Sequence, residues 1–225
     1  MSLERLRPLA FLILALPLGL FATAAPVEGD GGGTWRDCNL NCIEDVIDIA
    51  QGTSLDLDQN GVPDECEPTI VTWCEGDGAL NGGTDCPCLN NAPQGTTEGC
   101  LNRAGVGAAL TGTGLPSVSN DTLHLTCTGM PAGVPGYFFQ GQAEAGFNNY
   151  GNGLRCIGGP FIRMKKIAGI PGGVTLPLRG DPPISQQLAI PAGATRYYQV
   201  LYRDNLGPCS NGTNSSNGVK VVWGL

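Results

Sequence analysis

The chain has 225 residues, a formal net charge of −8 and only 14% charged residues. This acidic balance disfavours a nucleic-acid-binding protein, and the few bases, such as Arg163, Lys165 and Lys166, fit an ordinary solvated surface. The 35 glycines and 17 prolines predict many tight turns and few long helices, so the length suits one β domain with a small appendage.

The first element is a predicted secretory signal peptide over residues 1–24. Arg5 and Arg7 provide its basic start, residues 9–21 its apolar core, and residues 22–24 a small-residue cleavage site. A membrane anchor is the alternative, but it needs about twenty apolar residues, and this run is shorter and broken by Pro17. We therefore expect a secreted protein, extracellular or at the cell surface, with no membrane insertion after signal removal. A glycine-rich linker follows over residues 25–34.

Residues 35–68 form a predicted calcium-binding module, because most of the acidic charge is here. Residues 26–77 contain thirteen acids and one base, whereas residues 78–225 contain six acids and nine bases. Residues 56–67 match the twelve-residue calcium-loop pattern D-x-[DN]-x-[DN]-G-x5-E at every specified position, with Gly61 at the sharp turn. The predicted Ca²⁺ ligands are oxygen atoms of Asp56, Asp58, Asn60, Val62 (its carbonyl), Asp64 and Glu67.

Residues 37–48 repeat this EF-hand-like scheme less well. Their predicted ligands are oxygen atoms of Asp37, Asn39, Asn41, Ile43 (its carbonyl), Asp45 and Asp48. Cys42 takes the place of the turn glycine, where a Cβ is penalised, and Asp48 replaces the longer closing glutamate. The first loop offers three carboxylates and the second four, so we expect the second loop to bind Ca²⁺ more tightly. An acidic linker with Asn and Gly turns is the alternative interpretation.

The two loops resemble the calcium repeats of secreted bacterial proteins, of the dockerin and thrombospondin type 3 kinds. They are especially similar to the DxNxNGxPDEC runs of planctomycete secreted proteins. This resemblance implies an extracellular module that calcium orders, and in dockerins it also implies a cohesin partner.

Short elements follow along the rest of the chain. A helix is predicted over residues 45–50, ended by Gly52, and a connecting strand over residues 68–73. Residues 74–114 are rich in Gly, Asn and Thr without a sustained period, which predicts a disulfide-held loop region. The other predicted strands are residues 122–126, 136–140, 161–165, 174–178, 187–190, 197–203 and 219–223.

This pattern predicts that residues 69–225 form a mainly-β domain, an antiparallel, jelly-roll-like β-sandwich. In the strand at residues 197–203, Tyr198, Val200 and Tyr202 share one face, and one face of that strand can be core. Asn217 and Gly218 form a predicted hairpin turn that leads into the last strand.

Ten cysteines in an exported chain predict up to five disulfide bonds. They fall into three blocks, which are Cys38, Cys42 and Cys66, then Cys74, Cys86, Cys88 and Cys100, then Cys127, Cys156 and Cys209. If every thiol is paired, at least one bond joins two blocks, and we expect one between the module and the β domain through Cys127. The middle block can close on itself. A zinc site there is the alternative, although Cys86-Pro87-Cys88 lacks the usual two-residue ligand gap.

The C-terminal part also resembles an uncharacterised domain of planctomycete secreted proteins. The matching signals are the Cys86-Pro87-Cys88 motif, GLRCIGG at residues 153–159, RYYQVLYRD at residues 196–204, and the ending at residues 217–223. This resemblance implies a recurring secreted β domain with no known activity, and it implies that Cys156 pairs with Cys209.

Catalytic signals are sparse. His124 is the single histidine, and we expect it on the surface of a strand or in a hydrogen bond rather than as a general base. We therefore predict no enzyme, but a calcium-binding structural or adhesion protein with an extracellular protein or glycan as partner. A calcium-dependent lectin is the alternative, with an aromatic face beside a polar loop, and a secreted hydrolase is a third. The lectin residues would be Tyr150, Tyr197, Tyr202 and Trp223 with Asn148, Asn149 and Asn152, unless the aromatics fill the core.

Overall fold

A computed structural model describes residues 36–39, 41–56, 59, 61–63, 66–78, 85–210 and 212–224. Arg36–Leu225 belong to one compact unit. The predicted signal peptide and glycine-rich linker lie outside the described residues, and so do Asp58, Asn60 and Asp64 of the second loop.

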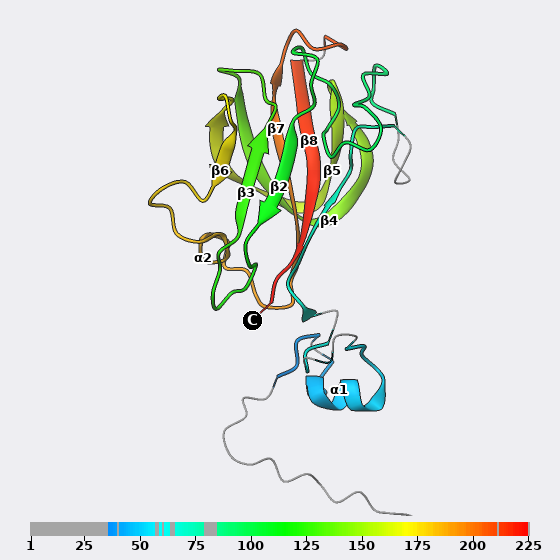
Figure 1. The fold of residues 1–225 in the computed structure, drawn as a ribbon, viewed down its shortest axis with the longest axis vertical. Helices are drawn as coiled ribbons and strands as arrows, with labels where there is room; N and C mark the ends of the chain where they lie inside the picture. The colour runs from blue at the N-terminus through cyan, green and yellow to red at the C-terminus, as the bar shows by residue number, and fades with distance from the viewer. Residues whose placement is uncertain are drawn as a thin grey trace, which may run out of the picture. The chain divides into compact units, whose positions relative to one another are not determined.

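Two antiparallel sheets form the β domain (Figure 1). The five-stranded sheet has the order β1-β8-β7-β4-β5, and the three-stranded sheet has the order β2-β3-β6. The elements are α1 (Asp45–Gln51), β1 (Thr69–Trp73), β2 (Ala109–Thr113), β3 (His124–Thr128), β4 (Pro135–Tyr150), β5 (Gly153–Ala168), β6 (Val174–Leu176), α2 (Ile184–Leu188), β7 (Thr195–Asp204) and β8 (Gly212–Val222). The prediction of a mainly-β, antiparallel, sandwich-like fold with a short helix is confirmed.

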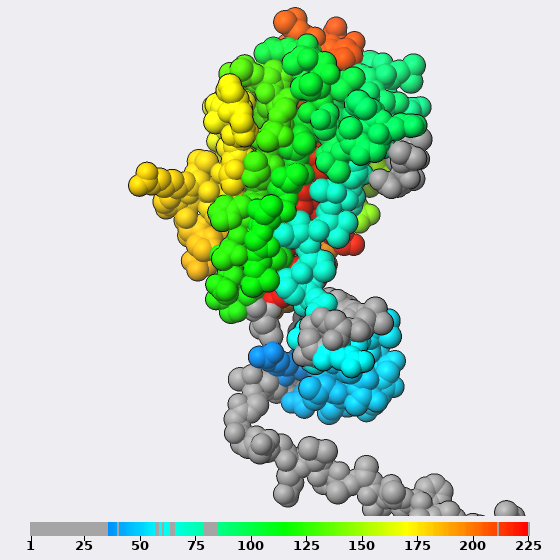
Figure 2. Space-filling model, viewed as in Figure 1, coloured from blue at the N-terminus to red at the C-terminus, as the bar shows by residue number. Residues whose placement is uncertain are grey.

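The main core lies between the two sheets. Tyr198, Val200 and Tyr202 share one face of β7 and are at most 2% exposed, as the period-two pattern predicts, while Gln199 and Leu201 on the opposite face are also buried. They pack in one cluster with Leu110 of β2 and Leu125 of β3, both fully buried. In Figure 2 the green atoms of β2 and β3 form a closed surface, and the red atoms of β8 show only in small patches.

The sequence predicted helix α1 correctly but predicted a strand where helix α2 lies. α1 ends where Gly52 adopts a left-handed φ of 69° and donates its N–H to the carbonyls of Asp48 and Ile49, as expected. The strand predicted at residues 187–190 is wrong, because this segment overlaps α2. Ile184 and Leu188 stand one helical turn apart and both pack on the core, so the helical spacing prevails over the short apolar run.

The strand predictions missed one strand and misplaced one turn. β2 lies inside the segment predicted to be a loop, and it pairs with β3. Asn217 and Gly218 are no hairpin turn, since both lie within β8. Asn217 is fully buried, and its side-chain amide replaces a strand partner: Oδ1 accepts the N–H of Leu110 at 2.6 Å and Nδ2 donates to the Leu110 carbonyl at 2.9 Å. This amide therefore joins one sheet to the other.

Replacing Asn217 with alanine is expected to lower the free energy of unfolding by about 2–4 kcal/mol, because two buried backbone groups of Leu110 lose their partner. Urea denaturation measures this change. The matched control is Asn120→Ala on the exposed surface, which should stay within about 0.5 kcal/mol of the parent. Equal effects of the two substitutions would contradict the role assigned to Asn217.

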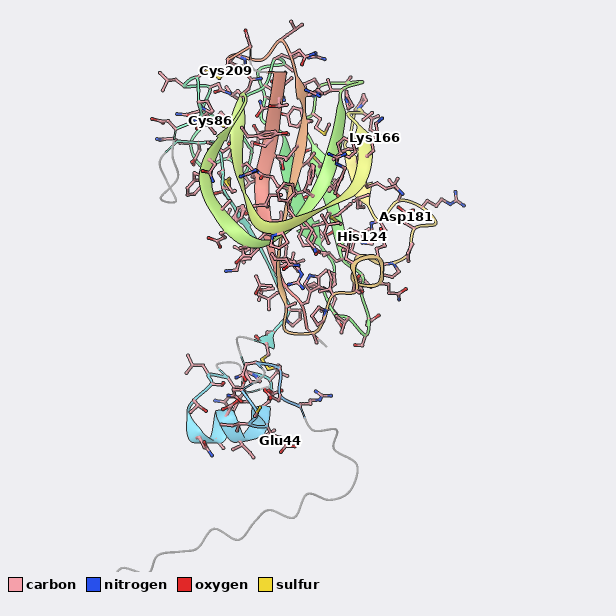
Figure 3. All side chains as sticks on the ribbon, turned by 180° about the vertical axis from the view of Figure 1, so that it is seen from behind. Glu44, Cys86, His124, Lys166, Asp181 and Cys209 are labelled. Carbon is pink, nitrogen blue, oxygen red and sulfur yellow. A yellow bond between two sulfur atoms is a disulfide. The ribbon has the colours of Figure 1, made fainter. Side chains whose placement is uncertain are left out.

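The long β4–β5 hairpin folds back over the outer face of the five-stranded sheet. Its pairing shifts register at three places, and in Figure 3 it curves in front of the other strands. Its tip is held by hydrogen bonds, since the Leu154 carbonyl accepts from Gln199 Nε2 at 2.8 Å and from Ser215 Oγ at 2.6 Å. Asn152 N–H also donates to the Thr213 carbonyl at 2.7 Å.

Four disulfide bonds are present, and their pairing corrects the predictions. They are Cys38–Cys66, Cys74–Cys156, Cys86–Cys100 and Cys88–Cys209. No bond joins the module to the β domain among the described residues, because Cys38 pairs within the module and Cys127 is free and buried. Burial raises the pKa of the Cys127 thiol to about 12, so it stays protonated.

The predicted Cys156–Cys209 bond is also wrong. Both of its cysteines pair instead with the middle block, which closes on itself only through Cys86–Cys100. All four cysteines of that block are bonded, so no thiolate remains for the alternative zinc site. The four bonds use eight of the ten cysteines, so Cys42 remains as an exposed free thiol beside the buried Cys127.

Candidate metal-binding loops

The two predicted loops share one backbone feature. Cys42 and Gly61 both occupy the sixth position, and both adopt positive φ, 68° and 83°. In each loop the N–H of this sixth residue donates to the carboxylate of the first, Cys42 to Asp37 at 2.8 Å and Gly61 to Asp56 at 2.9 Å. The described residues of the two loops therefore turn in the same register, and Cys42 stands at a glycine-type turn.

The side chains of the first loop converge on Asp48. Asn41 Nδ2 donates to Asp48 Oδ2 at 2.8 Å, and Asn39 Nδ2 lies 3.3 Å from the same oxygen. Asp37 accepts N–H groups of the same turn, including that of Asn41 at 3.1 Å. Predicted ligand positions three, five and twelve thus meet at one carboxylate, whereas the acids Asp37, Asp45 and Asp48 do not form one close cluster among the described residues. The loop thus offers carboxylate and amide oxygens, the donor types that a hard cation such as Ca²⁺ prefers.

Asp48 is fully buried, and its carboxyl group has a lowered pKa. The Thr53 hydroxyl donates to its Oδ1 at 2.7 Å. This hydrogen bond lowers the pKa of Asp48, burial opposes the shift, and the amides of Asn41 and Asn39 lower the pKa further. Asp48 is therefore held as a carboxylate, the form that binds a cation.

Two predicted ligands of the first loop have other contacts. Asp45, the ninth residue of the loop, is buried and accepts the N–H of Cys38 at 2.9 Å at the start of α1. The N–H of Ile43 donates to Asn41 Oδ1 at 2.8 Å, which positions the Asn41 side chain. Glu44, labelled in Figure 3, directly precedes α1 and occupies no predicted ligand position.

The second loop is described in part. Asp56 and Gly61 show the shared turn, and Val62 at position seven and Glu67 at position twelve are half-buried. The placement of Asp58, Asn60 and Asp64 lies outside the described residues, so their role as ligands stays a prediction.

The sequence did not predict two features of the module, the hydrogen bonds of Thr53 and Ser54 and the Cys38–Cys66 disulfide. Thr53 and the buried Ser54 follow the helix end and bond to the first loop, Thr53 to Asp48 and Ser54 Oγ within 3.4 Å of Asn39 Nδ2. The Cys38–Cys66 bond joins the second residue of the first loop to the eleventh residue of the second. Cys38, Asp45 and Cys66 lie close together, but both sulfurs belong to this disulfide and offer no thiolate to a metal.

The single histidine lies where it was expected, but several residues of the alternative lectin site do not. His124 is exposed, and its Nδ1 lies 2.9 Å from the Thr122 carbonyl, as expected for a surface strand residue. Tyr202, Trp223 and Asn152 are at most 2% exposed, so they belong to the interior and not to a sugar-binding face. Tyr150 and Tyr197 are half-buried on the other side of the sheet.

No protein-family model, no curated protein and no solved structure matches this chain. Within the described part of the chain, no helix has the length and apolar character needed to cross a membrane. The four disulfides are typical of proteins that fold in an oxidising compartment.

Proposed function

We propose that this protein is an exported calcium-binding protein that acts in structure or adhesion at a bacterial cell surface or outside the cell. The observation that supports this proposal best is the shared turn of the two loops, in which the sixth residue donates to the first carboxylate at positive φ. Two successive loops of one register, each rich in carboxylate and amide oxygens, suit two Ca²⁺ ions.

Calcium would act on the module as a folding ligand. Residues 26–77 contain thirteen acids and one base, so their negative charges repel one another. Two divalent ions would cancel four of these negative charges. Extracellular calcium modules have Kd values of about 10⁻⁴–10⁻³ M, so the ions would bind after export and stabilise the loops there. Isothermal titration calorimetry of the chelator-treated chain tests the proposal, and an absence of calcium-dependent heat would refute it.

The second loop is expected to be the tighter of the two sites. It offers four carboxylates against three, and Gly61 takes its positive φ without the Cβ penalty that Cys42 has. In the same titration, Asp56→Ala should remove the tighter class of sites and Asp37→Ala the weaker one. Glu44→Gln, which changes the charge equally inside the module, should leave both classes intact. Equal affinities, or a tighter first loop, would contradict this order.

A further inference from the structure

The folded-back β4–β5 hairpin encloses a groove on the outer face of the five-stranded sheet. Its volume is about 350 Å³, within the usual range for small-molecule sites. Its lining includes Tyr137, Phe139, Tyr150, Arg163, Lys166 and Arg203. None of the calcium-loop residues lines this groove.

The groove is positively charged although the whole chain is acidic. Arg163, Lys166 and Arg203 line it and are exposed, and no acidic residue is among the lining residues. Within the described residues, the ion pairs of the structure are Lys165 with Asp181 and Lys220 with Glu144, so these three cations have no carboxylate within 4.0 Å. A local cluster of unpaired cations in a concave site favours an anionic ligand.

Aromatic rings hold the central cation in place. The guanidinium of Arg163 lies 4.4 Å from the ring centroid of Tyr137 and 5.7 Å from that of Phe139. Phe139 in turn packs edge-on against Phe161 at 5.7 Å, and Arg155 lies 5.9 Å from the Phe161 centroid. Stacking of this kind orients the planar guanidinium, whose paired N–H groups match a carboxylate or sulfate.

The walls of the groove are fixed before any ligand arrives. The tip of the hairpin is tied to β7 and β8 by the hydrogen bonds of Leu154 and Asn152, and the Cys74–Cys156 bond ties β5 to the residue after β1. Tyr150, the last residue of β4, lies at this tied tip and lines the groove together with Tyr137 and Phe139 of the same strand. A preformed site loses little conformational entropy on binding.

We propose that this groove binds an acidic saccharide, a sugar residue that carries a carboxylate or a sulfate. Arg163, Lys166 and Arg203 take the anionic group, and the C–H faces of the sugar ring pack against Tyr137 and Tyr150. This proposal names the class of partner for the adhesive function proposed above. Only the biological role of the groove rests on that function. Its chemistry does not involve the calcium loops.

The test is calorimetric titration of the full chain with three oligosaccharides of one length. They are an oligogalacturonate, a sulfated galactan and a neutral galactan, titrated in chelator because uronates bind Ca²⁺ themselves. At least one acidic sugar should bind, roughly tenfold or more tightly than the neutral one, and the affinity should fall in about 0.5 M NaCl. The two acidic arms distinguish carboxylate from sulfate recognition.

Variants locate the site. Arg163→Gln should weaken binding roughly tenfold or more, and Arg203→Gln repeats the test if Arg163→Gln lowers the melting temperature. Arg179→Gln, an exposed charge outside the groove, is the matched control and should bind as the parent does. The proposal is overturned by no binding, by equal binding of the neutral sugar or of an acidic peptide of the same charge, or by equal effects of Arg163→Gln and Arg179→Gln. Calcium titration of the same variants after the chelator is removed shows separately whether the loops function.

Discussion

Addition of about 10 mM Ca²⁺ to the chelator-treated chain is expected to raise its free energy of unfolding by about 5 kcal/mol. At Kd values of about 10⁻⁴ M for the tighter second loop and about 2.5 × 10⁻⁴ M for the first, the two loops contribute about 2.7 and about 2.2 kcal/mol by mass action when only the folded state binds the ion. Much of this gain should come from relief of repulsion among the acids of the module, where the buried Asp48 is held as a carboxylate. Urea denaturation followed by circular dichroism, with Ca²⁺ or with chelator, measures the difference.

A double substitution provides the internal comparison for this result. Asp37→Ala with Asp56→Ala removes the first carboxylate of both loops, and the calcium-dependent gain should vanish. Glu44→Gln keeps all twelve predicted ligand positions and should retain the gain. A denaturation midpoint that does not move with Ca²⁺ in the parent chain would contradict both the sites and the proposed function.

Loss of the Cys88–Cys209 bond is expected to lower the free energy of unfolding by about 4–5 kcal/mol. This bond spans 121 residues, so in the chain-entropy model it restricts the unfolded state more than any other disulfide of the described chain. Cys88 is exposed, so serine at this position leaves no buried cavity, and the change reports mainly on the unfolded chain. The variant is Cys88→Ser with Cys209→Ser, measured by urea denaturation.

The free Cys42 offers the matched control for the disulfide. Cys42→Ser removes an exposed thiol without breaking a bond, and its stability should stay within about 0.5 kcal/mol of the parent. A peptide map of the unreduced chain should recover Cys88–Cys209 and Cys74–Cys156. Recovery of Cys156–Cys209 instead would show that the pairing described here is not the native one.

Sequence patterns predicted best the segments whose local signals agree with their surroundings. The alternation in β7 and the glycine at the end of α1 are of this kind, because side-chain direction and backbone conformation decide both. The register of the loops could also be read, since position six must turn sharply whatever surrounds it. The shared turn at Cys42 and Gly61 follows from the twelve-residue spacing alone.

Segments that depend on distant partners could not be predicted. β2 contains Gly112, which lacks a side chain because Ile70 of β1 lies where its Cβ would be. Gly218 is a similar case, since the ring of Trp73 covers it across β1 and β8. The Cys74–Cys156 pairing likewise depends on where the β4–β5 hairpin folds, which no spacing of cysteines encodes. The cationic groove arises from the same fold and has no signature in the sequence.

The hydrophilic first half of β8 has a consequence for the chain before it folds. Asn214, Ser215, Ser216 and Asn217 are at most 1% exposed, yet none of them is apolar. Strand segments that become buried in the centre of a sandwich are usually prone to aggregation while they are unpaired, because their apolar side chains promote intermolecular β structure. Here that stretch stays well hydrated until its specific hydrogen-bonding partners assemble, so this buried part of β8 contributes little to aggregation during folding.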